Sequence, residues 1–249
     1  MGELESFLKG RRVVLVGPSP KIIGKALGSA IDQYDVVIRI KKGFPVPLEM
    51  IQDYGKNTHV IMTNLRTDNH TNQLDPHTLA TFRQQGGMTL CVPYPLRSVE
   101  DRFRLSKEDR LAVSHWTKFD PRGIPVSYPI NFAEWTQIQN QIGSKPTIGA
   151  LAIYAILKCY VKELWILGMT FRVDFEMKDS NCNSPYHSSY LSPYLSWYKT
   201  PDQIRHSRMT IATGIHNVSR EQRYLKKLIH RHPETKLEEE TRLALIKSI

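Results

Sequence analysis

The residues best suited to chemistry in this sequence are histidines in its C-terminal third. His216 precedes Glu221 in a His-x4-Glu arrangement, and a helix from residue 217 would place the carboxyl group just over one turn beyond the histidine. Histidine is the usual general base near neutral pH, and a nearby carboxylate can orient its ring. A histidine is also often structural or simply exposed, and this chain has nine. His216 is therefore a candidate base, with the cap of a helix as the alternative.

Two short segments have the composition of a phosphate-binding turn. Gly17 and Ser19 follow an apolar run that suits a buried strand, and Thr147 and Gly149 open an apolar helical stretch just after Pro146. Backbone N–H groups at a strand-to-helix turn or at a helix N-terminus attract anions. Each segment alone fits an ordinary turn or helix start better, because neither the GxGxxG nor the GxxxxGK[ST] pattern is present.

Metal and disulfide chemistry have little support in the sequence. The three cysteines, Cys91, Cys159 and Cys182, lack CxxC spacing, and no HxxxH motif with an acidic partner occurs. No Asp-x-Asp pair follows a strand. We therefore expect neither a metal ion, a resident cofactor nor a disulfide framework.

The bulk composition limits the partners. The chain has 249 residues and a formal net charge of +10, which suits an anionic substrate or peripheral contact with an anionic membrane surface, but also a merely solvated basic surface. No nucleic-acid-binding motif accompanies this charge, so no nucleic acid partner is expected. Residues 1–12 contain no apolar segment of signal-peptide length, and the longest apolar run, 148–157, is too short to span a bilayer. A cytoplasmic location is the resulting expectation.

The order of apolar runs predicts an α/β fold with a Rossmann-like, mostly parallel sheet flanked by helices. Residues 1–249 are expected to form a single domain with its core at about 10–232, and residues 170–213 to form a long irregular segment of the kind that is often functional or mobile. Expected strands cover residues 12–17, 35–40, 58–63, 87–92 and 163–168. Expected helices cover residues 21–31, 76–85, 132–142, 146–160, 217–232 and 234–247.

Taken together and in this order, these segments resemble the motifs of the eukaryotic-type sialyltransferases. Residues 13–64 are similar to the large sialyl motif, with the glycine turn, Gly28, the 31–39 run and the 55–59 run as the matching features. Residues 145–171 are similar to the small sialyl motif, and His216 with Glu221 matches the short C-terminal motif. His187 stands where the family has a further catalytic histidine. The resemblance spans about residues 12–230.

The resemblance implies a single-domain, GT-A-like sialyltransferase fold. It also implies an inverting, metal-independent transfer of sialic acid, or a related keto-acid sugar, from a CMP-sugar donor to a hydroxyl of a glycan acceptor. His216 would be the general base, Glu221 would help to hold its ring, and His187 would stabilise the departing phosphate. Tyr186 and Tyr190 would line the acceptor side. The implied nucleotide-binding residues are Gly17, Ser19, Arg39, Lys41, Asn64, Thr147 and Gly149.

Three departures from the family pattern leave alternatives open. Pro18 and Lys41 stand where the family has asparagines, and Val13 replaces the cysteine that would pair with Cys159. An unpaired Cys159 fits a reducing compartment. A bacterial-type sialyltransferase is one alternative, since those enzymes have a similar first turn. A degenerate, non-catalytic nucleotide or glycan binder is the other, and the missing asparagines motivate it.

Overall fold

The computed structural model describes residues 3–40, 43–63, 76–93, 126–169, 171 and 217–246. The described strands form one sheet in the order β5-β4-β3-β2-β1-β6-β7, and every pair of neighbours is parallel. The strands are β1 (Arg12–Val16), β2 (Val36–Ile40), β3 (Val60–Met62), β4 (Thr89–Cys91), β5 (Val126–Ser127), β6 (Glu163–Leu167) and β7 (Thr235–Leu237). The expected parallel α/β sheet is confirmed.

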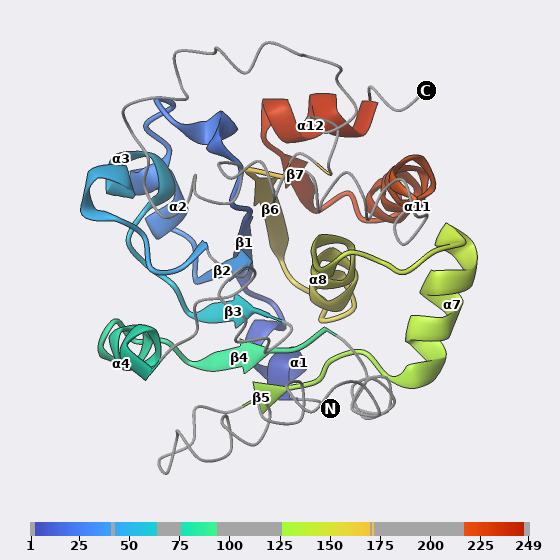
Figure 1. Ribbon diagram of the computed structural model, residues 1–249, viewed down its shortest axis with the longest axis horizontal. Coiled ribbons are helices and arrows are strands. Elements are labelled where there is room, and N and C mark those ends of the chain that lie inside the picture. Colours follow the sequence, from blue (N-terminus) through green and yellow to red (C-terminus); the bar gives the residue numbers. More distant parts are fainter. Residues whose placement is uncertain are drawn as a thin grey trace, which may run out of the picture.

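Helices cover both faces of this sheet (Figure 1). Helices α2 and α3 lie on one face, and α8, α7 and α11 lie on the other, with α8 directly against the strands. The helical elements are α1 (Glu3–Leu8), η1 (Pro20–Ile22), α2 (Gly28–Asp32), η3 (Leu48–Met50), α3 (Ile51–Tyr54), α4 (Pro76–Gln84), α7 (Phe132–Ile142), α8 (Ile148–Leu157), α11 (Val218–His230) and α12 (Glu239–Ile246). No helix among the described residues is long and apolar enough to cross a membrane.

The central strands are apolar on both sides because both sides are covered. Val13 and Leu15 of β1 pack into the larger core cluster with α8, while Val14 and Val16 pack into the smaller cluster beneath α2 and α3. Alternate residues of a strand face opposite sides of the sheet, so a strand buried on both sides has no polar face. This arrangement explains why β1 reads as a continuous apolar run rather than as an alternating one.

Helix α7 has the bounds that the sequence predicts. Its N-cap Asn131 accepts a hydrogen bond from the backbone of Glu134, whose side chain accepts one from the backbone of Asn131, which completes a capping box. The helix ends at Gly143, whose φ of 70° is the left-handed conformation that glycine adopts at low cost. Local signals at both ends therefore fix this helix.

The continuous helix expected over residues 21–31 does not form. A short 3-10 turn precedes it, and regular helix begins only at Gly28 because the backbone turns at Gly24 and Ala26, with φ values of 80° and 51°. The Asp53 carboxylate accepts hydrogen bonds from both of these amides, at 2.8 Å each. A tertiary contact 27 or more residues away thus replaces the helical hydrogen bonds.

The C-terminal segment also differs from expectation. Residues 235–237 form β7 beside β6, so the helix expected over 234–247 begins only at Glu239. The helix expected to reach residue 160 ends at Leu157, and α1 was not expected at all. At residues 235–237, pairing with β6 outweighs the local preference for helix.

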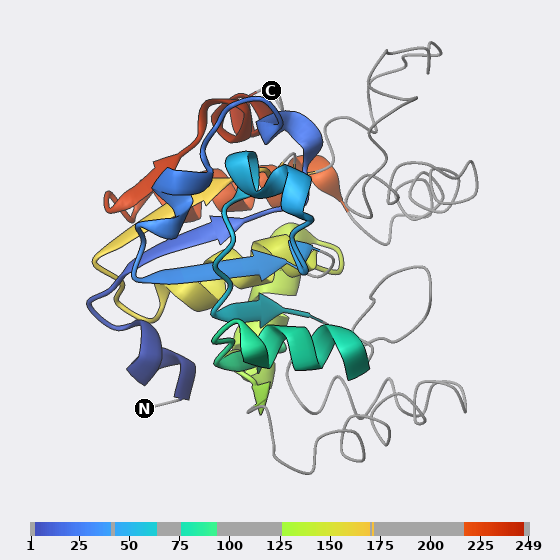
Figure 2. The same ribbon diagram turned by 90° about the vertical axis from the view of Figure 1, so that its left-hand side faces the viewer.

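The strand order reverses between β1 and β6. The chain builds the sheet outward from β1 to β5, then returns to place β6 on the other side of β1. In open parallel sheets the crevice at such a switch point, at the carboxyl ends of the strands, is the usual ligand-binding position. Figure 2 shows the strands running in one direction, with α11 starting near the edge where they end.

Candidate functional site

Two glycine turns meet at the switch point with no room for a side chain. Gly17 follows β1, and a Cβ atom added to it would lie 2.2 Å from the carbonyl oxygen of Gly168, which follows β6. A Cβ atom added to Gly168 would lie 2.7 Å from the carbonyl oxygen of Gly17, and the φ of Gly168 is 64°. Both positions therefore require glycine, the first for space and the second for space and conformation.

Backbone hydrogen bonds hold the two turns together. The amide of Gly17 donates to Leu167 at 2.9 Å, and the amide of Ser19 donates to Gly168 at 3.0 Å. The carbonyl of Ser19 accepts a 2.6 Å hydrogen bond from the Tyr54 hydroxyl, and the Ser19 hydroxyl accepts one from the amide of Lys21. The first turn is thus fixed from β6 on one side and from α3 on the other.

Met169 joins these turns to the start of α8. Its sulfur lies 2.6 Å from the position of a Cβ atom on Gly17, and its terminal methyl lies 2.6 Å from the position of a Cβ atom on Gly149. Gly17 and Gly149 therefore both pack on one side chain. The two predicted phosphate-binding segments, 132 residues apart in the chain, lie together at the switch point.

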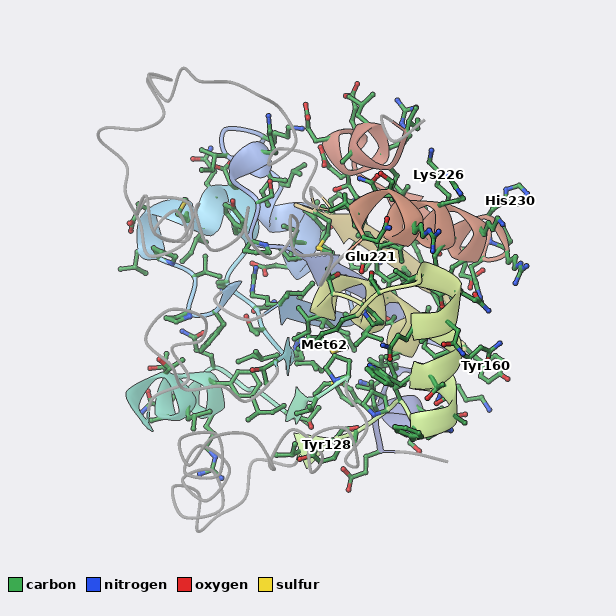
Figure 3. The ribbon with its side chains drawn as sticks, turned by 45° about the vertical axis from the view of Figure 1, so that its right-hand side comes forward. Met62, Tyr128, Tyr160, Glu221, Lys226 and His230 are labelled. Atoms are coloured by element: carbon green, nitrogen blue, oxygen red, sulfur yellow. The ribbon has the colours of Figure 1, made fainter. Side chains whose placement is uncertain are left out.

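A carboxyl group from α11 caps the start of α8. Thr147 is the N-cap of α8, and its hydroxyl accepts a hydrogen bond from the amide of Ala150. Glu221 accepts two hydrogen bonds from Thr147, one from the backbone N–H and one from the hydroxyl, each at 2.7 Å. Glu221 is only 5% exposed, and Figure 3 shows it on the side of α11 that faces α8. These bonds fix the start of α11 against the start of α8.

The same bonds limit which groups at the N-terminus of α8 are free to bind an anion. The amides of Thr147 and Ala150 already have acceptors, and the Thr147 hydroxyl is engaged as both donor and acceptor. The amides of Ile148 and Gly149 have no acceptor within the described ranges, so they are the groups able to bind a ligand there. Direct contact between Thr147 and a nucleotide stays a prediction, while its contact with Glu221 gives it a positioning role.

Helix α11 begins at a residue that is itself anchored. Asn217 caps the helix by accepting from the amide of Arg220, and its own amide donates to the Ser144 hydroxyl at 2.8 Å. That amide belongs to the peptide bond shared with residue 216. The cap of α11 is thus anchored to the loop that precedes α8, whereas His216 itself lies outside the described residues. The described contacts of Glu221 run to Thr147, and its predicted contact with His216 stays untested.

Arg39, one of the predicted nucleotide-binding residues, lies in β2 and supports the first turn through buried hydrogen bonds. It is completely buried, and its guanidinium donates to the carbonyls of Tyr54, Gly55 and Asn57 and to the Thr58 hydroxyl. Since Tyr54 in turn bonds the Ser19 carbonyl, Arg39 supports the loop that holds the first turn. These contacts give it a positioning role, and its direct contact with a nucleotide stays a prediction.

Several predicted site residues lie outside the described residues. They are Lys41, Asn64, Tyr186, His187, Tyr190 and His216. Sequence reasoning overlooked Ser144, Tyr54 and Met169. Only Met169 has a signal that could have found it, since it follows the glycine at the end of a buried strand.

No metal cluster marks the site among the described residues. No group of three or more His, Cys, Asp or Glu side chains in this part of the chain could hold a metal ion. An open hollow of about 650 Å³ runs along α7, away from the switch point. It is lined by Phe132, Ala133, Thr136, Gln137, Asn140 and Gln141, none of which is a predicted site residue. The glycine turns therefore define the site better than this hollow does.

Comparison with known proteins rests on structure. No family model matches the sequence, and no curated protein matches it. A mammalian sialyltransferase in complex with Gal-β-1-3GalNAc-ortho-nitrophenol is similar, with a TM-score of 0.51 and 14% identity over 94% of this chain and 71% of that one.

Two further solved structures are also similar. A mammalian sialyltransferase gives a TM-score of 0.46 and 16% identity over 92% of this chain and 69% of that one. The sialyltransferase CstII from Campylobacter jejuni, in complex with the substrate analogue CMP-3FNeuAc, gives a TM-score of 0.46 and 14% identity over 91% of this chain and 78% of that one. The similarity to the first structure shows that this chain has the sialyltransferase fold, a GT-A-like α/β arrangement around a parallel sheet.

Proposed function

We propose that this protein is an inverting sialyltransferase that moves sialic acid, or a related keto-acid sugar, from a CMP-linked donor to a glycan hydroxyl. The meeting of Gly17 and Gly149 on Met169 at the switch point carries the proposal. It supports a shared phosphate site formed by two segments that match the large and small sialyl motifs. The amides of Ile148 and Gly149 would face the leaving CMP phosphate.

Two histidines would perform the proton and charge chemistry. His216 would remove the proton of the acceptor hydroxyl as its oxygen bonds to the anomeric carbon of the sugar and the bond from that carbon to the phosphate oxygen breaks. His187 would stabilise the charge on the departing CMP. The anchoring of Asn217 by Ser144 supports the first role, because Asn217 is the residue that follows His216 in the chain. Tyr186 and Tyr190 would line the acceptor side. The similar mammalian enzyme was crystallised with a Gal-β-1-3GalNAc derivative, which supports a galactose-terminated acceptor.

Donor turnover tests this proposal directly. The protein is incubated with CMP-sialic acid, with and without the Gal-β-1-3GalNAc derivative, and released CMP and sialylated product are measured by chromatography. We expect slow CMP release alone and faster release with acceptor, unchanged by EDTA because the chemistry proposed uses no metal. Binding of CMP without any release would instead favour the non-catalytic alternative. Loss of activity in EDTA that Mn²⁺ or Mg²⁺ restores would contradict metal independence.

We also propose peripheral contact with an anionic membrane and a cytoplasmic location. Five basic side chains are exposed along α11 and at its C-cap, and none of them forms an ion pair with another described residue: Arg220, Arg223, Lys227, His230 and the cap residue Arg231. Figure 3 shows His230 pointing away from the sheet. A basic side chain near an anionic bilayer contributes about 1 kcal/mol. The buried free thiols of Cys91 and Cys159 are compatible with a reducing compartment.

Vesicle co-sedimentation tests the membrane contact. Wild-type protein should bind vesicles that contain phosphatidylserine, bind less as salt is raised, and lose most binding when Arg223, Lys227 and Arg231 are replaced by glutamine. A matched variant with glutamine at Lys9, Lys56 and Lys162, which are also exposed, controls for net charge. Equal loss in both variants would point to unspecific attraction, and binding to neutral vesicles would contradict the electrostatic basis.

A further inference from the structure

The last helix of the chain reaches the switch point. The hydroxyl of Thr241, in the first turn of α12, accepts a hydrogen bond from the amide of Met169 at 3.3 Å. Thr241 is completely buried. Met169 is the residue on which Gly17 and Gly149 both pack. The carbonyl of its neighbour Gly168 accepts a hydrogen bond from the amide of Ser19. The position of the turn after β6, at the candidate phosphate site, thus depends on α12.

Glu238 fixes Thr241 in turn. Its carboxylate accepts hydrogen bonds from the amide and the hydroxyl of Thr241, at 3.1 Å and 3.3 Å, and from the amide of Glu240. It also accepts a 2.6 Å hydrogen bond from the Lys25 ammonium group. Burial alone would raise the pKa of Glu238, but the bonds from Lys25 and from the two amides outweigh burial and lower it. The group is therefore a carboxylate at neutral pH, held by partners from two segments.

Lys25 links Glu238 back to the segment that follows the first glycine turn. It lies six residues after Ser19 on the segment that follows the first glycine turn. The links run from Ser19 to Gly168 and Met169, on to Thr241 and Glu238, and back to Lys25. A closed path of this kind fixes the two turns relative to each other more firmly than the Ser19 amide could alone.

We propose that Thr241, held by Glu238 and Lys25, is a positioning residue for the CMP phosphate. The proposal rests on the function proposed above, and it adds to that function a dependence of donor affinity on a helix outside the three sialyl motifs. None of these three side chains needs to touch the nucleotide. Their effect would pass through the Met169 amide to the two glycine turns.

Calorimetric titration with CMP tests the proposal. Thr241→Val keeps the branched shape but leaves the Met169 amide without its acceptor, so we expect the dissociation constant for CMP to rise roughly fivefold to tenfold. Thr241→Ser keeps the hydroxyl and should stay within about twofold of wild type. Thr235→Val is the matched control: the Thr235 hydroxyl in β7 is buried without a hydrogen-bond partner among the described residues, and its removal should leave affinity unchanged.

A second variant and a second readout keep the test decisive. Lys25→Met removes only the partly exposed ammonium partner, so it should fold even if Thr241→Val does not, and we expect it to weaken CMP binding about threefold. Amide hydrogen exchange without nucleotide should be faster at Gly17, Ser19, Gly168 and Met169 in both variants than in wild type. Folded variants with wild-type affinity and wild-type exchange would overturn the proposal. If wild type itself fails to bind CMP, the donor assignment falls, while exchange still shows whether Thr241 fixes the turns.

Discussion

The candidate site has two parts that are built by opposite means. Around Gly17 and Gly168 the contacts are backbone to backbone, and they are possible because glycine has no side chain. Around Thr147 the contacts are made by side chains, with Glu221 joining two helices from 74 residues away. The first part is specified by steric exclusion and the second by hydrogen-bond pairing. The two parts should therefore respond differently to mutation.

The largest effect should come from His216, the proposed base that precedes Asn217 in the chain. His216→Ala is expected to lower kcat by about two to four orders of magnitude, because the variant lacks the proposed general base. CMP affinity should stay within a few fold, since the group acts in the transition state rather than in nucleotide binding. The measurement is steady-state transfer from CMP-sialic acid, alongside a melting profile that confirms folding. Near wild-type turnover would leave His187 as the remaining candidate for the base.

The backbone part should be destabilised by any side chain added at its glycines. Gly17→Ala would place a methyl group against the Gly168 carbonyl, and we expect the free energy of unfolding to fall by about 3 kcal/mol. Gly10→Ala is the matched control, because a Cβ atom there has no neighbour within 4 Å. Its φ of 70° should cost only about 1 kcal/mol. Chemical denaturation measures both, and equal losses would mean that the contact at the switch point is not tight.

Weakening the Glu221–Thr147 link between α11 and α8 should lower the free energy of unfolding by less. Glu221→Gln puts an NH2 group against one of the two Thr147 donors, and the expected loss is about 1–2 kcal/mol of unfolding free energy. Glu234→Gln is the comparison, since Glu234 pairs with His232 where both side chains are about 30% exposed. That change should stay within about 0.5 kcal/mol. A larger loss at Glu234 than at Glu221 would contradict the anchoring role.

The smallest effect concerns pH and involves His59, which lies at the amino end of β3, away from the candidate site at the carboxyl ends of the strands. The His59 Nδ1 atom accepts a 2.9 Å hydrogen bond from the amide of Val37. Burial and the nearby charges of Arg11 and Arg39 lower the pKa of His59, against an opposing contribution from Asp32. The unfolded chain therefore binds this proton more readily than the folded chain, so stability should fall as pH drops below about 6.5.

A pH series of denaturation curves tests this expectation. His59→Gln retains an acceptor for Val37 and should show a weaker loss of stability below neutral pH than wild type. Identical pH profiles in the two proteins would contradict the assignment to His59.

The elements of both parts can be predicted from the sequence, but the long-range side-chain pairs that join them cannot. The apolar strands ending in Gly17 and Gly168, and the helix start at Thr147, follow from local pattern, and the strand order brings them to one edge. The Glu221–Thr147 pair, the Asp53 bonds that break the 21–31 helix and the Thr241–Met169 bond join residues 27 to 74 positions apart. Periodicity and capping signals extend over only a few residues, so they cannot predict such pairs.

The central claim is that the switch point binds a cytidine nucleotide. Titration calorimetry of the wild-type protein with CMP and with UMP, in EDTA, tests it most directly. We expect CMP to bind at least about tenfold more tightly than UMP, equivalent to about 1.4 kcal/mol. We also expect Gly17→Ala to weaken CMP binding far more than Gly10→Ala does. Equal affinity for the two nucleotides, or no binding of either, would contradict it.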